Sequence, residues 1–157
     1  MPPDATGRIV GIDHGERRIG VAVSDPTGVL ASARGVVEVR GPAQSCREVA
    51  GICREVGAVR VVVGLPVRMD GSEGESARRA REFGGRLAAS TGLPVEYWDE
   101  RFSTVTAQQA LIEGGVRRER RREIVDQVAA QILLQHYLDA RAGPAPAGGF
   151  VAGDAGP

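Results

Sequence analysis

Three consecutive valines, Val61 to Val63, restrict the fold of this chain more than any other feature. They lie in the run VRVVVG, from Val59 to Gly64. A short β-branched run of this kind is typical of a strand that is covered on both faces, as in a parallel sheet. Parallel neighbours need crossover connections, which are usually helices. The run therefore predicts an α/β fold with helices on the faces of a sheet.

The rest of the chain supplies the partners of this strand. The valine- and isoleucine-rich segments Arg8–Asp13 and Ile19–Asp25 predict a hairpin around the turn His14–Arg18, and a third strand lies within Val29–Arg40. Helices are predicted over Ala43–Val56 and Glu75–Thr91, with Gly92 as a C-cap, and Leu93–Trp98 is a further strand. Beyond it we expect a short helix from Ser103 or Thr104 to Ile112, an arginine-rich link at Val116–Glu123, and a last helix at Ile124–Ala140.

The expected order is β-β-β-α-β-α-β-α-α, and it forms one mixed five-stranded sheet with helices on its faces, within a single domain. We expect this domain to cover residues 8–141 of the 157. Residues 1–7 form a short polar lead. Residues 142–157, which are rich in glycine, alanine and proline, are expected to be a disordered tail.

Composition excludes several kinds of chemistry. All 20 basic residues are arginine, so a phosphate-binding loop of the Walker A type and a Schiff-base mechanism are both excluded. The two histidines and two cysteines are too scattered for a zinc site of usual spacing. Cys46 and Cys53 lie seven residues apart on one helix face, too far for a disulfide, and are expected to be buried thiols in a reducing cytoplasm. Any catalysis must therefore rely on carboxylates and arginines.

Acidic residues stand at structurally unusual places in three predicted elements. Asp13 ends an apolar strand and shares a face with Ile9 and Gly11. Asp99 and Glu100 follow another strand, where open α/β sheets bind their ligands. Asp126 heads the apolar stripe of the last helix, which contains Ala129, Ala130, Leu133 and Tyr137. Ordinary structural roles are the alternatives. Asp13 would cap a turn, and Asp99 and Glu100 would belong to a polar loop. Asp126 would be a first-turn acid that the helix dipole favours.

If these acids meet at one sheet edge, they need a cation to stay ionised together. Carboxylate oxygens select Mg²⁺ or Mn²⁺. Two such ions would activate a water and stabilise the leaving oxygen during hydrolysis of a phosphodiester.

Arginines are concentrated just before the last helix. Five of the six positions from 117 to 122 are arginine: Arg117, Arg118, Arg120, Arg121 and Arg122. Guanidinium groups bind phosphates in bidentate fashion, so this cluster favours polyanion binding in a chain of zero formal net charge. The alternative is a solvated face neutralised by Glu119 and Glu123.

Four ordered motifs resemble the YqgF/RuvX family over about Arg8 to Ala140. They are GIDHG (Gly11–Gly15) continuing into RIGVAVSD (Arg18–Asp25), VGLP with MDG (Val63–Pro66 and Met69–Gly71), DERFST (Asp99–Thr104), and VDQVAA with IL (Val125–Ala130, Ile132–Leu133). The resemblance implies an RNase H-like fold of the Holliday-junction-resolvase type. It implies a bacterial cytoplasmic nuclease that matures the 5′ end of pre-16S ribosomal RNA or resolves DNA junctions, and symmetric cutting of a junction would require a homodimer.

The resemblance also implies the site. It places Mg²⁺ or Mn²⁺ on Asp13, on Glu100 or Asp99, and on Asp126, with Arg101 in the same motif as a further contact to nucleic acid. His14 departs from the family pattern, which usually has an apolar residue there. It is expected either to face the other side of the sheet or to perturb the metal site.

Three other functions remain open at this stage. The first hairpin also resembles the phosphate-binding hairpin of actin-like ATPases and sugar kinases, although those proteins need two such domains. A non-catalytic nucleic-acid-binding factor in ribosome assembly or transcription is a second alternative, because a fold does not determine a function. A purely structural partner in ribosome assembly is the third.

Overall fold

The computed structural model describes residues 7–99 and 118–142, with side chains in the last helix described from Gln127 onward. These ranges contain eight elements: β1 (Arg8–His14), β2 (Arg18–Ser24), β3 (Ala31–Glu38), α1 (Pro42–Val56), β4 (Ala58–Leu65), α2 (Glu75–Thr91), β5 (Val95–Asp99) and α4 (Arg118–Ala142). The predicted strands and helices in the described ranges are thereby confirmed.

The strands form one mixed sheet in the order β3-β2-β1-β4-β5. β1 and β2 form the predicted antiparallel hairpin, and β3 extends it, also antiparallel. β4 is parallel to both of its neighbours, β1 and β5. The valine run thus lies in an inner strand, with Val61, Val62 and Val63 all fully buried. The carboxyl ends of β1, β4 and β5 consequently meet at the same end of the sheet.

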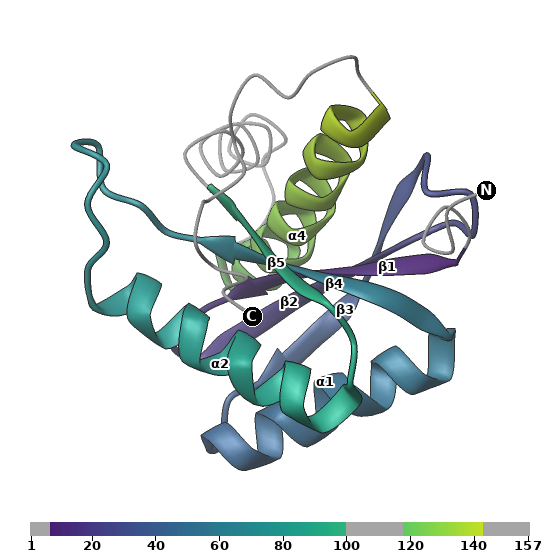
Figure 1. The fold of residues 1–157 in the computed structure, drawn as a ribbon. Coiled ribbons are helices and arrows are strands. Elements are labelled where there is room, and N and C mark those ends of the chain that lie inside the picture. The colour runs from purple at the N-terminus through teal and green to yellow at the C-terminus, as the bar shows by residue number, and fades with distance from the viewer. Residues whose placement is uncertain (1–6, 100–117, 143–157) are drawn as a thin grey trace.

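Among the described residues, helices cover the two faces of this sheet unequally (Figure 1): α1 and α2 lie on one face, and α4 lies on the other. The larger core lies under α1 and α2 and includes Ile12, Val63 and Tyr97. The second core, under α4, includes Ile9 and Trp98. Alternating residues along β1 and β5 therefore point to different helices.

The last helix is longer than predicted. α4 begins at Arg118, so the segment expected to be a link from Val116 to Glu123 is helical from Arg118 onward. Arginine and glutamate are good helix formers, and propensity here outweighs the loop interpretation that charge density suggested. The expected short helix from Ser103 or Thr104 to Ile112 lies outside the described residues.

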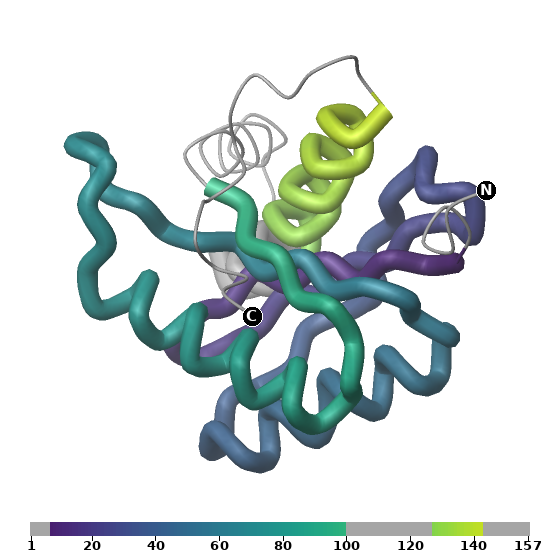
Figure 2. Tube along the Cα trace, in the orientation of Figure 1, coloured from purple at the N-terminus to yellow at the C-terminus, as the bar shows by residue number. Residues whose placement is uncertain are grey.

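The connection between β4 and α2 is a loop that extends away from the sheet (Figure 2). Its tip is a turn in which the amide of Gly71 donates to the carbonyl of Arg68, at 2.8 Å. Across this turn Val67 and Glu73 form an isolated antiparallel bridge.

Two smaller expectations are also confirmed. Gly92 ends α2 in the left-handed conformation, with φ of 74°, and its amide donates to the carbonyl of Ala88. Cys46 and Cys53 are buried free thiols on the inner face of α1. Among the described residues, no helix combines the length and apolar character that a bilayer crossing requires.

Candidate active site

Asp13 lies near the carboxyl end of β1, the middle strand of the sheet. Alternation along the strand places its side chain on the α4 face, which Ile9 and Gly11 also face. The side chain is half-buried. Within the described part of the chain, no hydrogen bond or ion pair engages its carboxylate. A half-buried acid without a protein partner keeps its oxygens available to a ligand.

Gly11 sets how closely α4 approaches β1. A Cβ atom added at this glycine would lie 2.8 Å from Cβ of Leu134 and 3.4 Å from the carbonyl oxygen of Ala130. Ala129 and Ala130 are buried, as expected for small residues that allow a helix close to a sheet. The predicted inner stripe of α4 is therefore confirmed from Ala129 to Tyr137.

Asp126 is helical and lies one turn before Ala130, which rests over Gly11. Figure 1 shows that the later, yellow part of α4 lies toward the start of β1. Earlier turns of α4 consequently lead toward the end of β1, where Asp13 is found. The Asp126 side chain lies outside the described part, as do those of Arg118, Arg120, Arg121 and Arg122.

Asp99 ends β5 and is only 6% exposed. Asp99 is two residues after Tyr97 and so faces the same side of the strand. Tyr97 belongs to the core under α1 and α2, whereas Trp98 belongs to the core under α4. Asp99 thus lies at the same end of the sheet as Asp13 but on the opposite face. Glu100, Arg101 and Arg117 lie outside the described residues.

His14 points away from Asp13, as one of the two expectations for it required. Its ring packs against Phe83 of α2, with 5.0 Å between the ring centroids. Burial lowers the pKa of His14, an effect that the charge of neighbouring Asp13 opposes. This departure from the family motif therefore lies on the other face of the sheet.

A polar network that sequence reasoning missed holds α4 against the sheet. Arg60 of β4 forms an ion pair with Glu96 of β5, and the Tyr137 hydroxyl donates to the same carboxylate at 2.9 Å. Burial, reinforced by the charge of Glu96, raises the pKa of Tyr137. A tyrosine in an otherwise apolar helix stripe is the one signal in the sequence that points to such a buried partner.

The described residues contain no group of three or more histidine, cysteine, aspartate or glutamate side chains placed to hold a metal ion. Two of the three expected metal-binding acids lie outside this set, since Glu100 and the side chain of Asp126 are not among the described residues. Asp13 is therefore the only one of the three whose side chain the structure places.

Comparison with known proteins agrees with the fold and the motifs. The chain is similar to candidate pre-16S rRNA nucleases, with 46% identity to that of Pelotomaculum thermopropionicum, over 87% of this chain and 90% of the relative. Identity to the relative of the same name from Symbiobacterium thermophilum is 48%, over 88% of this chain and 96% of the relative. Thermus thermophilus RuvC in complex with a Holliday junction substrate has a similar structure, with a TM-score of 0.55 and 18% identity over 92% of this chain and 99% of that one.

The RuvC likeness confirms the expected RNase H-like fold, and its low identity limits it to that. The family identity rests instead on the sequence relatives and on a family model, RuvX, described as Holliday junction resolvase, which matches residues 7–140. Together they show that this chain belongs to the RuvX family of nucleases.

Proposed function

We propose that this chain hydrolyses phosphodiester bonds of nucleic acid with divalent metal ions held by Asp13, Glu100 and Asp126. The observation that carries the proposal is the Asp13 carboxylate, half-buried on a central strand beneath α4 and without a partner among the described residues. Oxygen donors of this kind fit Mg²⁺ or Mn²⁺. When bound, such ions supply Lewis acidity that activates water and stabilises the leaving oxygen.

Glu100, rather than Asp99, is the proposed companion of Asp13. Asp99 lies on the face covered by α1 and α2, opposite to Asp13. If the alternation of β5 continues by one residue, Glu100 comes to the α4 face. Asp99 then has a structural role at the end of β5. Glu100 and Asp13 then lie on either side of the end of β4.

The proposed role of α4 is to deliver Asp126 to the same place. The contact of Ala130 and Leu134 with Gly11 fixes the height of the helix above β1. The hydrogen bond from Tyr137 to Glu96 fixes its register. These contacts support a position for Asp126 near Asp13, where its carboxylate would share a metal ion.

The proposed substrate is pre-16S ribosomal RNA, which the curated relatives at 46% and 48% identity carry in their names. Cleavage in its 5′ leader is what the family resemblance implies. The family description names a second substrate, the Holliday junction. Resolution of a junction would additionally require a homodimer, because two strands are cut symmetrically. The arginines at the start of α4, with Arg101 and Arg117, are proposed to contact the phosphate backbone.

The test is to incubate the purified chain with a pre-16S leader fragment and with a four-way junction, side by side, with and without Mn²⁺. Asp13→Asn and Asp126→Asn should each abolish cleavage and weaken Mn²⁺ binding measured by calorimetry, because an amide is a poorer ligand than a carboxylate. Asp139→Asn is the matched control: this acid is exposed on α4 and accepts a hydrogen bond only from Gln135 within the described residues.

Cleavage that persists in the presence of a chelator, or that both site variants retain, would contradict the proposal. Binding of either substrate without any cleavage would favour the non-catalytic factor. Removal of a carboxylate should leave the fold intact, since it relieves repulsion among neighbouring acids.

A further inference from the structure

A cavity of about 490 Å³ lies on the face of the sheet opposite to Asp13. It opens between the first turn of α1, the middle of α2 and the end of β1. Val39, Pro42 and Phe83 supply the apolar part of its lining, and the other lining residues are polar or charged, among them His14, Ser45 and Arg86. A concave site that combines apolar surface with polar groups is the usual form of a small-ligand pocket.

Ser45 is the most unusual residue of this lining. Its side chain is 1% exposed, and its hydroxyl has no hydrogen-bond partner among the described residues. A buried hydroxyl that makes no hydrogen bond is unfavourable by about 1–3 kcal/mol. A ligand in the cavity would satisfy this hydroxyl, which can both donate and accept.

The start of α1 adds backbone donors beside Ser45. Gly41 caps the helix without a side-chain hydrogen bond, and Pro42 occupies the first turn. The amide of Ser45 already donates to the carbonyl of Gly41. Donors of the first turn before Ser45 have no partner inside the helix, as at any helix start. Pro42 and Ser45 are the residues of this turn that line the cavity, and the Ser45 hydroxyl is the hydrogen-bonding group that they bring to it.

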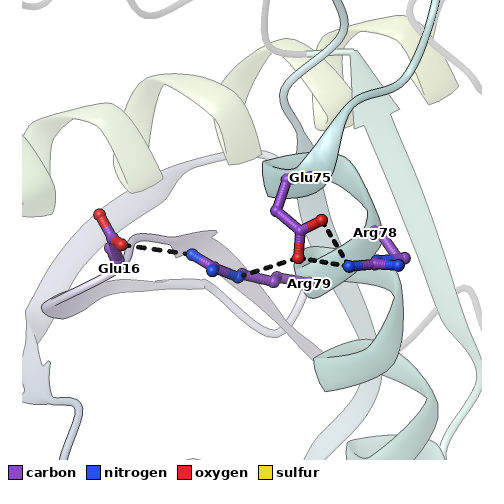
Figure 3. A network of polar contacts seen from close by, with 4 residues as sticks. All are labelled: Glu16, Glu75, Arg78 and Arg79. Carbon is purple, nitrogen blue, oxygen red and sulfur yellow. Dashed lines mark hydrogen bonds and ion pairs between the residues drawn. The ribbon is translucent and has the colours of Figure 1, made fainter.

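Charges around the cavity cancel, which argues against a simple anion site. Arg79 contacts Glu16 at 3.3 Å and Glu75 at 3.5 Å, and Glu75 also pairs with Arg78 (Figure 3). Those four side chains thus neutralise one another. Arg78 lies outside the lining, and the other charged residues of the lining are one acid and one base of α2, Glu82 and Arg86.

We propose that this cavity binds an unpaired nucleobase of the nucleic-acid substrate, with Ser45 contacting the polar edge of the base. A base is neutral and flat, with apolar faces and an edge of donors and acceptors, so it matches the lining. His14 lines the cavity and directly follows Asp13 in β1. A nucleotide near the proposed cleavage point would reach the cavity around the β1–β2 turn. The inference rests on the proposed function, because it takes the substrate from there.

The test uses the full ¹⁵N-labelled chain, titrated separately with adenosine, guanosine, cytidine, uridine and inorganic phosphate, without metal and without cleavage. At least one nucleoside should shift the amide signals of Ser45 and Phe83. Ser45→Ala should weaken that binding about five- to tenfold, as expected for one hydrogen bond. Ser32→Ala, on an exposed position of β3, is the matched control and should leave the affinity unchanged.

Three results would overturn the proposal: no shift with any nucleoside, equal affinity in Ser45→Ala, or shifts of the same signals by phosphate alone, which would indicate an anion site. None of these results depends on hydrolysis. A failure here therefore differs from a failure of the metal-dependent cleavage assay, which tests the proposed function itself.

Discussion

The hydroxyl of Tyr137 donates a hydrogen bond of 2.9 Å to the Glu96 carboxylate and so joins α4 to strand β5. The ring of Tyr137 also meets that of Trp98 edge to face, with 6.1 Å between centroids. Both contacts lie on the α4 face of the sheet. The helix that carries Asp126 is thus held by a specific polar contact as well as by apolar packing.

Tyr137→Phe should destabilise the fold by about 1–3 kcal/mol, because it removes a hydrogen bond to a charged acceptor and keeps the ring. Urea unfolding measures the change. The ion pair between Arg60 and Glu96 remains in this variant, so Glu96 is not left without a partner. A free energy of unfolding equal to that of the wild type would show that the hydroxyl contributes nothing to the docking of α4.

Gly11→Ala should lower stability by about 1–3 kcal/mol, the usual effect of overpacking. The new methyl group would lie 2.8 Å from Cβ of Leu134, so either the helix or the strand must move. If Asp126 acts with Asp13, displacement of α4 should also reduce cleavage in the fraction of protein that remains folded.

Gly85→Ala is the matched control for that substitution. Gly85 lies on an exposed position of α2, and an added Cβ would meet nothing within 4 Å. This variant should gain up to about 1 kcal/mol, from improved helix propensity. A stable Gly11→Ala variant with full activity would mean that the close approach of α4 and β1 is not required.

Much of this fold could be predicted from periodicity and turn residues. The valine run identified an inner strand, and the i, i+3, i+4 stripe of α1 identified its buried face, including Cys46 and Cys53. The start of α4 was predicted wrongly, because an arginine-rich segment has no apolar period that distinguishes a helix from a link. The described helix begins at Arg118, and the arginines and glutamates before Ile124 are good helix formers.

The site was harder to predict than the fold, because it depends on faces and on distances between elements. Alternation placed Asp13 on a face correctly, yet the sequence offered Asp99 and Glu100 as equivalents. The assignment of Tyr97 and Trp98 to different cores gives the face of Asp99 alone, because Glu100 lies outside the described residues. The unpartnered hydroxyl of Ser45 is a property of packing and leaves no pattern along the chain.

The stability of the chain should fall as pH rises above 9. Burial raises the pKa of the Cys53 thiol from 9.0 to about 11. The unfolded chain therefore releases this proton at a lower pH than the folded chain. The contribution of Cys53 to stability is fully present below pH 9 and is lost as pH rises toward 11. Unfolding free energies measured at pH 8, 9 and 10 should decline, and Cys53→Ala should show a shallower decline. Equal slopes in both proteins would contradict this assignment.

Charge reversal at the start of α4 tests whether the arginine cluster contacts phosphates. The double variant Arg120→Glu with Arg121→Glu should bind all nucleic acids more weakly and to a similar degree, since phosphate contacts carry no sequence information. Each lost contact should reduce the slope of log affinity against log salt concentration by about one unit. Cleavage at saturating substrate should change little, because neither residue is a proposed metal ligand.

The matched control for this experiment is Arg47→Glu with Arg54→Glu. Both residues are exposed on α1, which covers the opposite face of the sheet, and neither forms an ion pair within the described residues. The control changes net charge by the same amount, so it isolates the position of the charges from their number. A solvated face balanced by Glu119 and Glu123 would leave the salt slope of the Arg120 and Arg121 variant unaltered. A reduction of the slope in that variant, absent from the control, would assign the phosphate contacts to the first turns of α4.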